Sequence, residues 1–497
     1  MADLDLRRGA LVALLGGASL TAALPPFGWW PLGLLGTGLL AVAVAGRAWR
    51  GRLAVGAAAA AGFLGPGLFW MTEFSAPGFV AAVVIEASIL TAGVLAVPAA
   101  TGRRWPLLLG IPGTLVLVEG LRGIWPFGGV PIATLAQTQV GGPLATTVRV
   151  GGPLLLAALV ALTGTALALA LRPEGRRAAA GALGVVALVA AGGWAAPNGS
   201  DTGELRVAMV QGGGERGTLA VETSSTEVFE RHLAITEEVG DVDLVVWPED
   251  ILKVEGDVTD AEVGRVMGRL ARQREATFVV GSAEGVGDRF RVVSTAWGPD
   301  GEPVDRYHKN LRVPFGEYVP FRPLVERLAD VSPIPRDALE GEGIGLLVTP
   351  AGDLGVAVSF EVFFAHLTRS ATTAGAEVIL VPTNAASYST TQMPALQLGA
   401  TRLRALETGR WIVQAAPTGF SAIVDPDGRV TVASDLGEGV ALEGMVATRR
   451  GLTPYGRTGD VPWVAFALAA VAAAWVTGMR SGAIGWRGGR QAAAGRG

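Results

Sequence analysis

Residues 308–320 read HKNLRVPFGEYVP and follow directly on a short β-rich run, Val304–Tyr307. Lys309 is one of only two lysines in the 497-residue chain, and arginine supplies the other basic side chains. A lysine kept in such a chain indicates a position that needs a compact ammonium rather than the planar fork of arginine. The second lysine, Lys253, has no evident role in the sequence. Lys309 is therefore the first candidate functional residue.

Two further motifs carry polar groups at the ends of expected strands. Trp247-Pro248-Glu249 closes the apolar run Val242–Trp247, and Ser359-Phe360-Glu361 closes the run Val356–Phe360. Residues at the carboxyl ends of strands converge on one crevice in many α/β folds. Taken singly, each carboxylate and Lys309 also fits an ordinary solvated surface position. Their common placement favours a shared site.

Residues 201–460 alternate β-rich runs with helical patterns, which predicts a layered α/β fold. Turn sequences at 299–301 and 350–353 predict two hairpins. The expected strands are 205–211, 242–247, 277–282, 292–297, 304–307, 346–349, 356–360, 377–382, 412–416 and 421–424, and the expected helices are 224–239, 260–274, 361–374 and 393–409.

The composition separates this region from the rest of the chain. Half of all residues are hydrophobic and 17% are charged, whereas about 25% are charged in a typical soluble protein. Residues 1–200 hold few acidic groups and several long apolar runs. We expect a transmembrane domain of about seven helices at 1–200, a globular domain at 201–460, and a C-terminal membrane helix with a tail at 461–497.

Long apolar runs predict a polytopic α-helical membrane domain. A helix crosses the hydrocarbon core with about 20 apolar residues. The first run is expected to stay in the chain, because further spans follow directly and no clear signal cleavage site is present. Tryptophans at span ends, Trp70 among them, are interpreted as an interfacial aromatic belt. About eight spans are expected, at 8–24, 28–46, 53–72, 78–100, 105–121, 150–171, 178–196 and 461–479.

The arginines indicate the orientation of these spans. Positive charge marks cytoplasmic loops, and arginines cluster in alternate loops, whereas the loops between them carry almost no lysine or arginine. The pattern places both termini in the cytoplasm and residues 201–460 outside. The Ala/Gly richness and the use of arginine in place of lysine are typical of a GC-rich bacterial genome, so we expect the membrane to be a bacterial plasma (inner) membrane. The clusters begin at Arg7, Arg47, Arg103, Arg172 and Arg480.

Several classes of site are excluded or not expected. Without cysteine the chain can form no disulfide, no thiolate metal site and no thiol nucleophile. Its three histidines have no metal-ligand spacing, so no metal site is expected. No basic stripe interleaved with aromatic residues is present, so we expect no nucleic-acid partner. No nucleotide motif is visible, and we expect no cofactor.

The three motifs together resemble the nitrilase (carbon–nitrogen hydrolase) superfamily, whose Glu-Lys-Cys triad occupies the places of Glu249, Lys309 and Ser359. The run VPFGEYVP at 313–320 and the arrangement of spans are characteristic of its apolipoprotein N-acyltransferase branch. The resemblance covers essentially the whole chain and implies a nitrilase-like αββα sandwich for the globular domain. It extends to EGLRG at 119–123, RLRALETGR at 402–410 and YGRTGD at 455–460.

This resemblance implies transfer of an acyl chain, through an acyl-enzyme, from a phospholipid to the amino-terminal group of diacylglyceryl-cysteine on an apolipoprotein. Glu249 would then be the general base, Lys309 the oxyanion-stabilising cation, and Ser359 the residue at the nucleophile position. Glu317 resembles a second glutamate that supports the lysine, and Glu361 the acidic residue just beyond the nucleophile. The expected partners are the phospholipid donor, the apolipoprotein acceptor and the lipid bilayer.

Ser359 departs from the family, and so does the Gly-Gly-Gly run after Gln211. A hydroxyl is far less acidic than a thiol and usually relies on a histidine base. His308 adjoins Lys309, but consecutive side chains of a strand face opposite ways. Three hypotheses stay open: a cysteine replaced by engineering, a natural serine variant with slow transfer, and a non-catalytic membrane homologue that binds lipid or a partner protein. The eight spans argue against a membrane-anchored amidase, because a soluble amide would not require them.

Both lipid substrates keep their acyl chains in the bilayer, so the active site should meet them just above the outer leaflet. We expect a loop near Pro314–Phe321, or the aromatic run Phe360–Phe364, to lie close to the membrane and gate access. Phe315, Tyr318 and Phe360 are the candidate substrate-binding residues.

Overall fold

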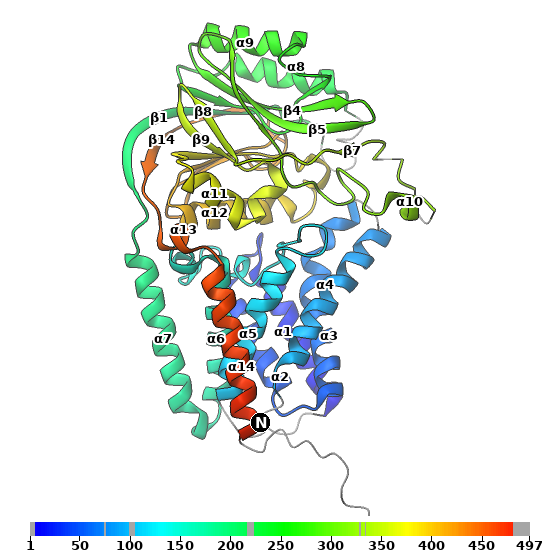
Figure 1. Cartoon of the computed structure of the whole chain (residues 1–497), viewed down its shortest axis with the longest axis vertical. Coiled ribbons are helices and arrows are strands. Elements are labelled where there is room, and N and C mark those ends of the chain that lie inside the picture. Colours follow the sequence, from blue (N-terminus) through cyan, green and yellow to red (C-terminus); the bar gives the residue numbers. More distant parts are fainter. Residues whose placement is uncertain are drawn as a thin grey trace, which may run out of the picture.

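The computed structural model describes residues 5–73, 76–98, 105–215, 223–327, 330–332 and 334–480. A bundle of long helices occupies one end of the molecule and two β-sheets occupy the other (Figure 1). Arg103, Arg104 and the tail expected at 481–497 lie outside the described residues.

The bundle contains a helix at each of the eight expected spans. By length and composition, five of the helices in the described residues could cross a membrane, namely α4, α5, α6, α7 and α14, and α2 is a shorter apolar helix. The chain thus has the character of a membrane protein, whereas the number of spans stays a prediction. The eight helices are α1 (Leu6–Ala23), α2 (Trp30–Val44), α3 (Trp49–Gly67), α4 (Ala76–Ala96), α5 (Trp105–Arg122), α6 (Val148–Ala170), α7 (Arg176–Ala195) and α14 (Val461–Arg480).

The two arginines of the loop 122–149 are buried and paired. Arg122 donates to Glu86 of α4 and to two backbone carbonyls of the following loop. Arg149 donates to Asp427 in the turn between two strands of the upper domain. Neither arginine is therefore a free positive charge of that loop, and Arg149 joins the bundle to the sheets.

The upper domain, which runs from β1 to β14, is a sandwich of two sheets. The strand order is β14-β1-β2-β4-β5-β6 in the first sheet and β13-β12-β11-β10-β9-β8 in the second. Two short strands, β3 and β7, pair with β4 and β5. The first sheet comprises β1 (Ser200–Gln211), β2 (Leu244–Val246), β3 (Leu252–Glu255), β4 (Thr277–Val286), β5 (Arg289–Trp297), β6 (Pro303–His308), β7 (Asp337–Ala338) and β14 (Val440–Arg450). The second comprises β8 (Leu346–Thr349), β9 (Gly352–Val356), β10 (Val378–Pro382), β11 (Ile412–Ala415), β12 (Ala422–Val424) and β13 (Val430–Ala433).

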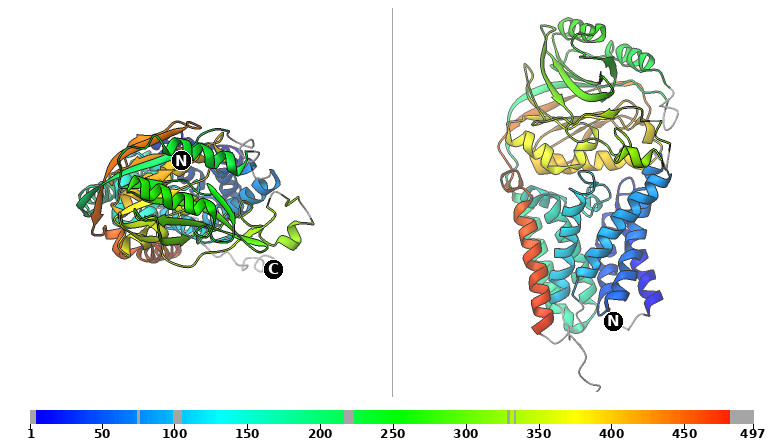
Figure 2. Two further views of the ribbon diagram at one scale, coloured as in Figure 1. Left: turned by 90° about the horizontal axis from the view of Figure 1, so that it is seen from above. Right: turned by 45° about the vertical axis from the view of Figure 1, so that its right-hand side comes forward.

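Helices cover the outer face of each sheet, which completes an αββα arrangement. Figures 1 and 2 show α8 (Ser225–Thr236) and α9 (Glu262–Arg274) on the side away from the bundle. The same views place α11 (Ala365–Thr373) and α12 (Met393–Thr408) between the second sheet and the bundle. The expected nitrilase-like layering is thereby confirmed.

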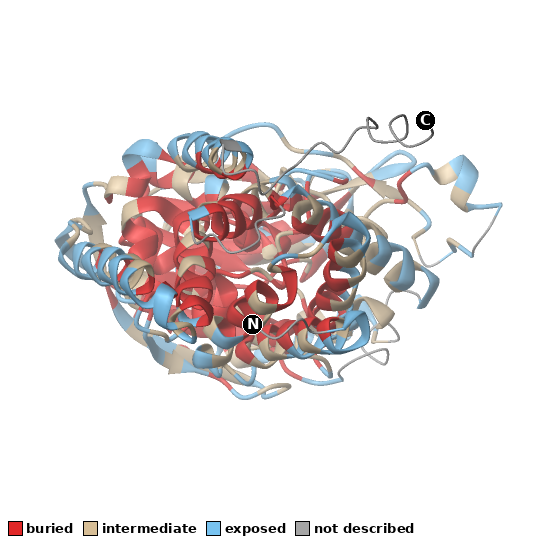
Figure 3. Ribbon diagram, turned by 90° about the horizontal axis from the view of Figure 1, so that it is seen from below, coloured by how far each residue is buried: buried red, intermediate tan, exposed pale blue. Residues whose placement is uncertain are grey.

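The alternation of side chains along the strands builds these layers. Successive residues of a strand face opposite sides of its sheet. On β1, Val207 and Met209 enter the core between the sheets, whereas Ala208 and Val210 pack under α8 and α9. On β10, Ile379 and Val381, which are two residues apart, belong to one hydrophobic core that continues into the bundle helices. Seen from the bundle end, the buried residues fill the middle of the molecule and exposed ones lie at its margin (Figure 3).

Two expectations about the elements were wrong. The strand expected at 356–360 ends at Val356, and residues 359–363 form a 3₁₀ turn, η6 (Ser359–Phe363), so that the next helix begins at Ala365 rather than at 361. The long strand β14 was not expected, although it pairs with β1 from Ser200↔Arg450 to Gln211↔Val440. Its sequence, VALEGMVATRR, has little apolar alternation, so pairing with β1 rather than local propensity determines the strand.

Candidate active site

Three charged side chains from two loops meet in the sandwich. Glu249 follows β2 and Lys309 follows β6, and both are 3% exposed. The Lys309 Nζ donates to Glu249 Oε1 at 2.8 Å and also to Glu317 Oε1. Glu317 in turn accepts the N–H of Val313 at 2.9 Å, which fixes the turn that carries it. The sequence HKNLRVPFGEYVP thus folds back so that its lysine and its glutamate touch.

The cluster of Glu249, Lys309 and Glu317 can bind an additional proton. Burial raises the pKa of Glu249 to about 8, although the charge of Lys309 opposes this. Burial alone would lower the pKa of Lys309, but Glu249 and Glu317 together raise it above its usual range. The ammonium is therefore permanent, and two carboxylates share it. The cluster can accept one further proton without leaving a net buried charge.

Ser359 occupies a strained turn between β9 and η6. Its φ is +52°, a conformation that side-chain-bearing residues seldom adopt, and its side chain is half-buried. Such strain recurs where a strand-to-helix turn presents a nucleophile. The hydroxyl of Thr383, the residue after β10, donates to Ser359 Oγ at 3.4 Å.

Glu361 is saturated by donors rather than open to a substrate. Its carboxylate accepts the hydroxyl of Tyr307 at 2.9 Å and the N–H groups of Asn310 at 2.8 Å, Leu311 at 3.1 Å and Val358 at 2.8 Å. These bonds tie the loop after Lys309 to the turn of Ser359. We therefore propose that Glu361 positions these two loops, although the sequence grouped it with the candidate catalytic residues.

An apolar cavity of 160 Å³ lies beside these loops. Phe315 and Phe360 line it from the sandwich, and α4 together with residues of the loop after α5 lines it from the bundle. Tyr318, the third expected substrate-binding residue, does not line this cavity, because its ring packs under the guanidinium of Arg312 at 4.2 Å.

Trp70 also lines this cavity, and its expected place in an interfacial belt is wrong. It is 2% exposed, and its ring meets that of Tyr388 edge-on with centroids 5.6 Å apart. Trp70 therefore contributes to the wall between the bundle and the site.

None of the three histidines hydrogen-bonds to Ser359 within the described residues. His232 is buried on α8, where its ring bonds to Gly212 and Val228, and burial lowers its pKa to about 4. The ring of His308 lies near the charges of Arg291 and Arg306. In the same residues no group of histidine, aspartate and glutamate could hold a metal ion. No histidine base is therefore bonded to Ser359 in the described part of the chain.

Sequence reasoning missed several contributors to the site. Thr383 directly follows β10, and the rule that placed Glu249 and Lys309 at strand ends could have found it. Tyr307 directly precedes the motif, but its bond to Glu361 spans 54 positions. Tyr388 belongs to the short turn η7 (Ala386–Tyr388) and gave no signal in the sequence.

Comparisons with known proteins show which family the chain is similar to. The family model of the apolipoprotein N-acyltransferase N-terminal domain matches residues 16–166, and that of carbon-nitrogen hydrolase matches residues 206–449. An apolipoprotein N-acyltransferase of Pseudomonas aeruginosa is 30% identical over 488 residues, covering 90% of this chain and 91% of that protein. One of Azotobacter vinelandii is 29% identical and covers 93% of each chain. A solved structure of Saccharomyces cerevisiae Nit3, from branch 10 of the nitrilase superfamily, has a TM-score of 0.37 and 17% identity, covering 53% of this chain and 96% of that one.

Proposed function

The chain belongs to the apolipoprotein N-acyltransferase family, and we propose that it transfers an acyl chain from a phospholipid to the α-amino group of a diacylglyceryl-modified lipoprotein. It is a bacterial membrane protein with acyltransferase relatives along most of its length. We further propose that it is a multi-pass protein of the inner membrane, with residues 1–200, 201–460 and 461–497 as its membrane, extracytoplasmic and C-terminal parts.

The observation that carries the proposal is the apolar cavity beside the charged cluster. Phe360, which lines it, directly follows Ser359, and Val313, which also lines it, donates to Glu317. The opposite wall belongs to bundle helices. An acyl chain rising from the bilayer can therefore reach the turn of Ser359 while its tail stays among apolar side chains. A soluble substrate would need no such passage.

The proposed chemistry begins with attack of Ser359 Oγ on the ester carbonyl of the phospholipid. Glu249 accepts the hydroxyl proton, and the ammonium of Lys309 stabilises the negative oxygen that forms. The tetrahedral intermediate collapses to an ester on Ser359, and the departing lysophospholipid alkoxide takes the proton from Glu249. In the second half the acceptor amine attacks this ester, gives one proton to Glu249, and leaves as an amide. Glu249 then returns the proton to Ser359.

A serine makes both halves slower than a cysteine would. A thiol with a pKa of about 8.5 is readily ionised beside a cation, whereas a hydroxyl gives up its proton only as it attacks. An ester is also less reactive towards an amine than a thioester. The raised pKa of Glu249 partly offsets this, because a more basic carboxylate is a better proton acceptor. We therefore propose a slow natural enzyme for the chain as it stands.

The second candidate is a non-catalytic homologue that binds lipid or a partner protein. One observation favours it: within the described residues, the hydrogen bond that involves the hydroxyl of Ser359 comes from Thr383 at 3.4 Å. A serine without a bonded base is a weak nucleophile.

Mass spectrometry of the acceptor distinguishes the two candidates. The full chain in mixed micelles is incubated with a defined phospholipid and a synthetic diacylglyceryl-cysteinyl peptide. Transfer adds one acyl mass to the peptide amine and releases one lysophospholipid. Glu249→Gln is the matched control and should abolish both products. No acylated peptide from this chain or from its Ser359→Cys variant would support the binding homologue instead.

A further inference from the structure

A second cavity, of 220 Å³, has a larger share of polar lining than the apolar cavity and includes Asp250, the neighbour of Glu249 in the chain. Its rim is exposed and includes Glu215, Ser225 and Lys253, whereas Ile251 and Thr418 in its floor are buried. The remaining wall residues include Arg231 of α8, Asp250, and Asn384 of the loop after β10. The cavity therefore opens to solvent and narrows towards the interior of the sandwich.

Two polar atoms in this cavity are buried and have no partner. The Oδ1 of Asp250 and the Oγ1 of Thr418 make no hydrogen bond within the described residues. Asp250 also has a φ of +59°, which only a well-supported turn maintains. Buried polar atoms in native proteins are almost always paired, and two unpaired ones on residues that line the same cavity favour a polar ligand there.

Lys253, for which the sequence indicated no role, also lines this cavity. Its side chain makes no ion pair or hydrogen bond within the described part of the chain. It stands on β3, where it projects from the exposed rim. Lys253 is thus a hydrogen-bond donor without an acceptor, and it lines the same cavity as Asp250 and Thr418.

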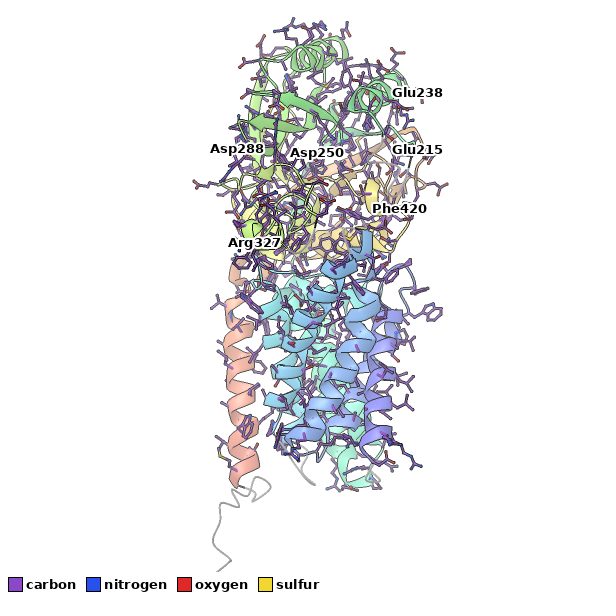
Figure 4. All side chains as sticks on the ribbon, turned by 90° about the vertical axis from the view of Figure 1, so that its right-hand side faces the viewer. Glu215, Glu238, Asp250, Asp288, Arg327 and Phe420 are labelled. Carbon is purple, nitrogen blue, oxygen red and sulfur yellow. The ribbon has the colours of Figure 1, made fainter. Side chains whose placement is uncertain are left out.

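Two residues that line this cavity directly follow residues of the candidate active site in the chain. Asp250 directly follows Glu249, and Asn384 directly follows Thr383, which bonds to Ser359. Figure 4 shows Asp250 within the sandwich and Glu215 towards its margin. A molecule that fills the cavity therefore contacts the residues after Glu249 and Thr383 and reaches the exposed rim.

The charges of the cavity disfavour a phosphate. Arg231 is engaged by Glu227, so its charge is balanced. Asp250 and Glu215 then face the single free cation of Lys253 among the described wall residues. An anionic headgroup would meet net repulsion, whereas a peptide backbone offers N–H groups to Asp250 and carbonyls to Lys253 and Thr418.

We propose that this cavity binds the first polypeptide residues that follow the modified cysteine of the acceptor. The inference rests on the proposed function and specifies how that function selects its acceptor. The donor and the acceptor's lipid chains need the apolar cavity on the bundle side. Only the acceptor carries a polypeptide that must leave the site into water, and an extended peptide advances about 3.3 Å per residue along such a channel.

The test compares two acceptors that differ only in their polypeptide. One is S-diacylglyceryl-cysteine amide and the other is the same cysteine extended to a tetrapeptide amide; the dissociation constant of each is measured for the full chain in micelles. We expect the tetrapeptide to bind at least tenfold more tightly. Thr418→Val and Lys253→Ala should each remove most of that difference. Asp288→Asn, at an exposed turn elsewhere on the sandwich, should leave it unchanged.

Three results would overturn the inference. The native chain could bind both acceptors with equal affinity. The variants could lower the affinity for both acceptors equally. The variants could instead lower the affinity for phospholipid, which would make the cavity a headgroup site. Each variant is checked by its melting temperature, and either one alone suffices for the comparison. Acylation of Ser359→Cys by phospholipid needs no acceptor. If phospholipid does not acylate Ser359→Cys, the proposed function is contradicted. If it does, but the tetrapeptide binds no more tightly than the cysteine amide, this inference alone is contradicted.

Discussion

Lys309 donates a 2.8 Å hydrogen bond to Glu249, and both side chains are almost fully buried. The cation and the carboxyl that the proposed mechanism requires are therefore part of one cluster. A buried pair of this kind is costly to break from one side, because the remaining charge keeps its burial and loses its partner. Lysine at this position, in a chain with only one other lysine, fits the catalytic role proposed for it.

Removal of the cation should affect both catalysis and stability. In Lys309→Met two carboxylates are left without their partner, and we expect a loss of about 3–5 kcal/mol in unfolding free energy. Acyl-adduct formation in the Ser359→Cys background should fall by about 10²–10³-fold. Lys309→Arg should not restore it, because a planar guanidinium does not fit between two carboxylates that hold an ammonium. A Lys309→Arg variant with full activity would contradict the assigned geometry.

The rate of acylation should depend on pH through Glu249. The carboxyl accepts a proton only when ionised, and its pKa is raised to about 8 by burial. The rate should therefore rise about tenfold per unit as pH increases towards 8 and level off above it. The native Ser359 chain is the better protein for this measurement, because its nucleophile does not titrate in that range. A flat profile between pH 6 and 9 would exclude Glu249 as the base.

Glu361→Gln should lower the acylation rate without moving its pH dependence. The carboxylate accepts four hydrogen bonds, and an amide nitrogen cannot accept those that it replaces. Each buried donor left without a partner costs about 1–3 kcal/mol, so we expect a rate at least tenfold lower and the same apparent pKa. A shifted apparent pKa would mean that Glu361 takes part in proton transfer.

Phe321 should matter only for donors embedded in a bilayer. Its side chain is 72% exposed, and its ring meets that of Phe127 from the bundle side with centroids 6.0 Å apart. In Phe321→Ala we expect acylation from vesicle phospholipid to fall several-fold, while acylation from a soluble short-chain ester is unchanged. Val348, an apolar residue of β8 that is 61% exposed, supplies the matched Val348→Ala control. Equal rates of acylation from vesicle phospholipid in Phe321→Ala and Val348→Ala would show that this loop does not gate access.

The sequence predicted the parts of the site that depend on strand ends and motifs. Glu249 and Lys309 follow strands whose apolar residues are plain in the sequence, so their convergence could be expected. The turn of Ser359 could not, because its positive φ depends on Glu361 and on bonds from a loop some 50 residues away. The polar cavity was equally hidden, since Asp250 and Thr418 reach it from distant segments and nothing local marks either residue.

Intact-protein mass spectrometry after incubation with phospholipid tests the central claim most directly. We expect an acyl-sized mass increase on Ser359 in the native chain, a faster one on the cysteine of Ser359→Cys, and none in Ser359→Ala. An adduct on the cysteine variant alone would mean that the scaffold is an N-acyltransferase and that this chain is its disabled form. No adduct on any of the three would contradict the account and favour a homologue that binds lipid or a partner without turning it over.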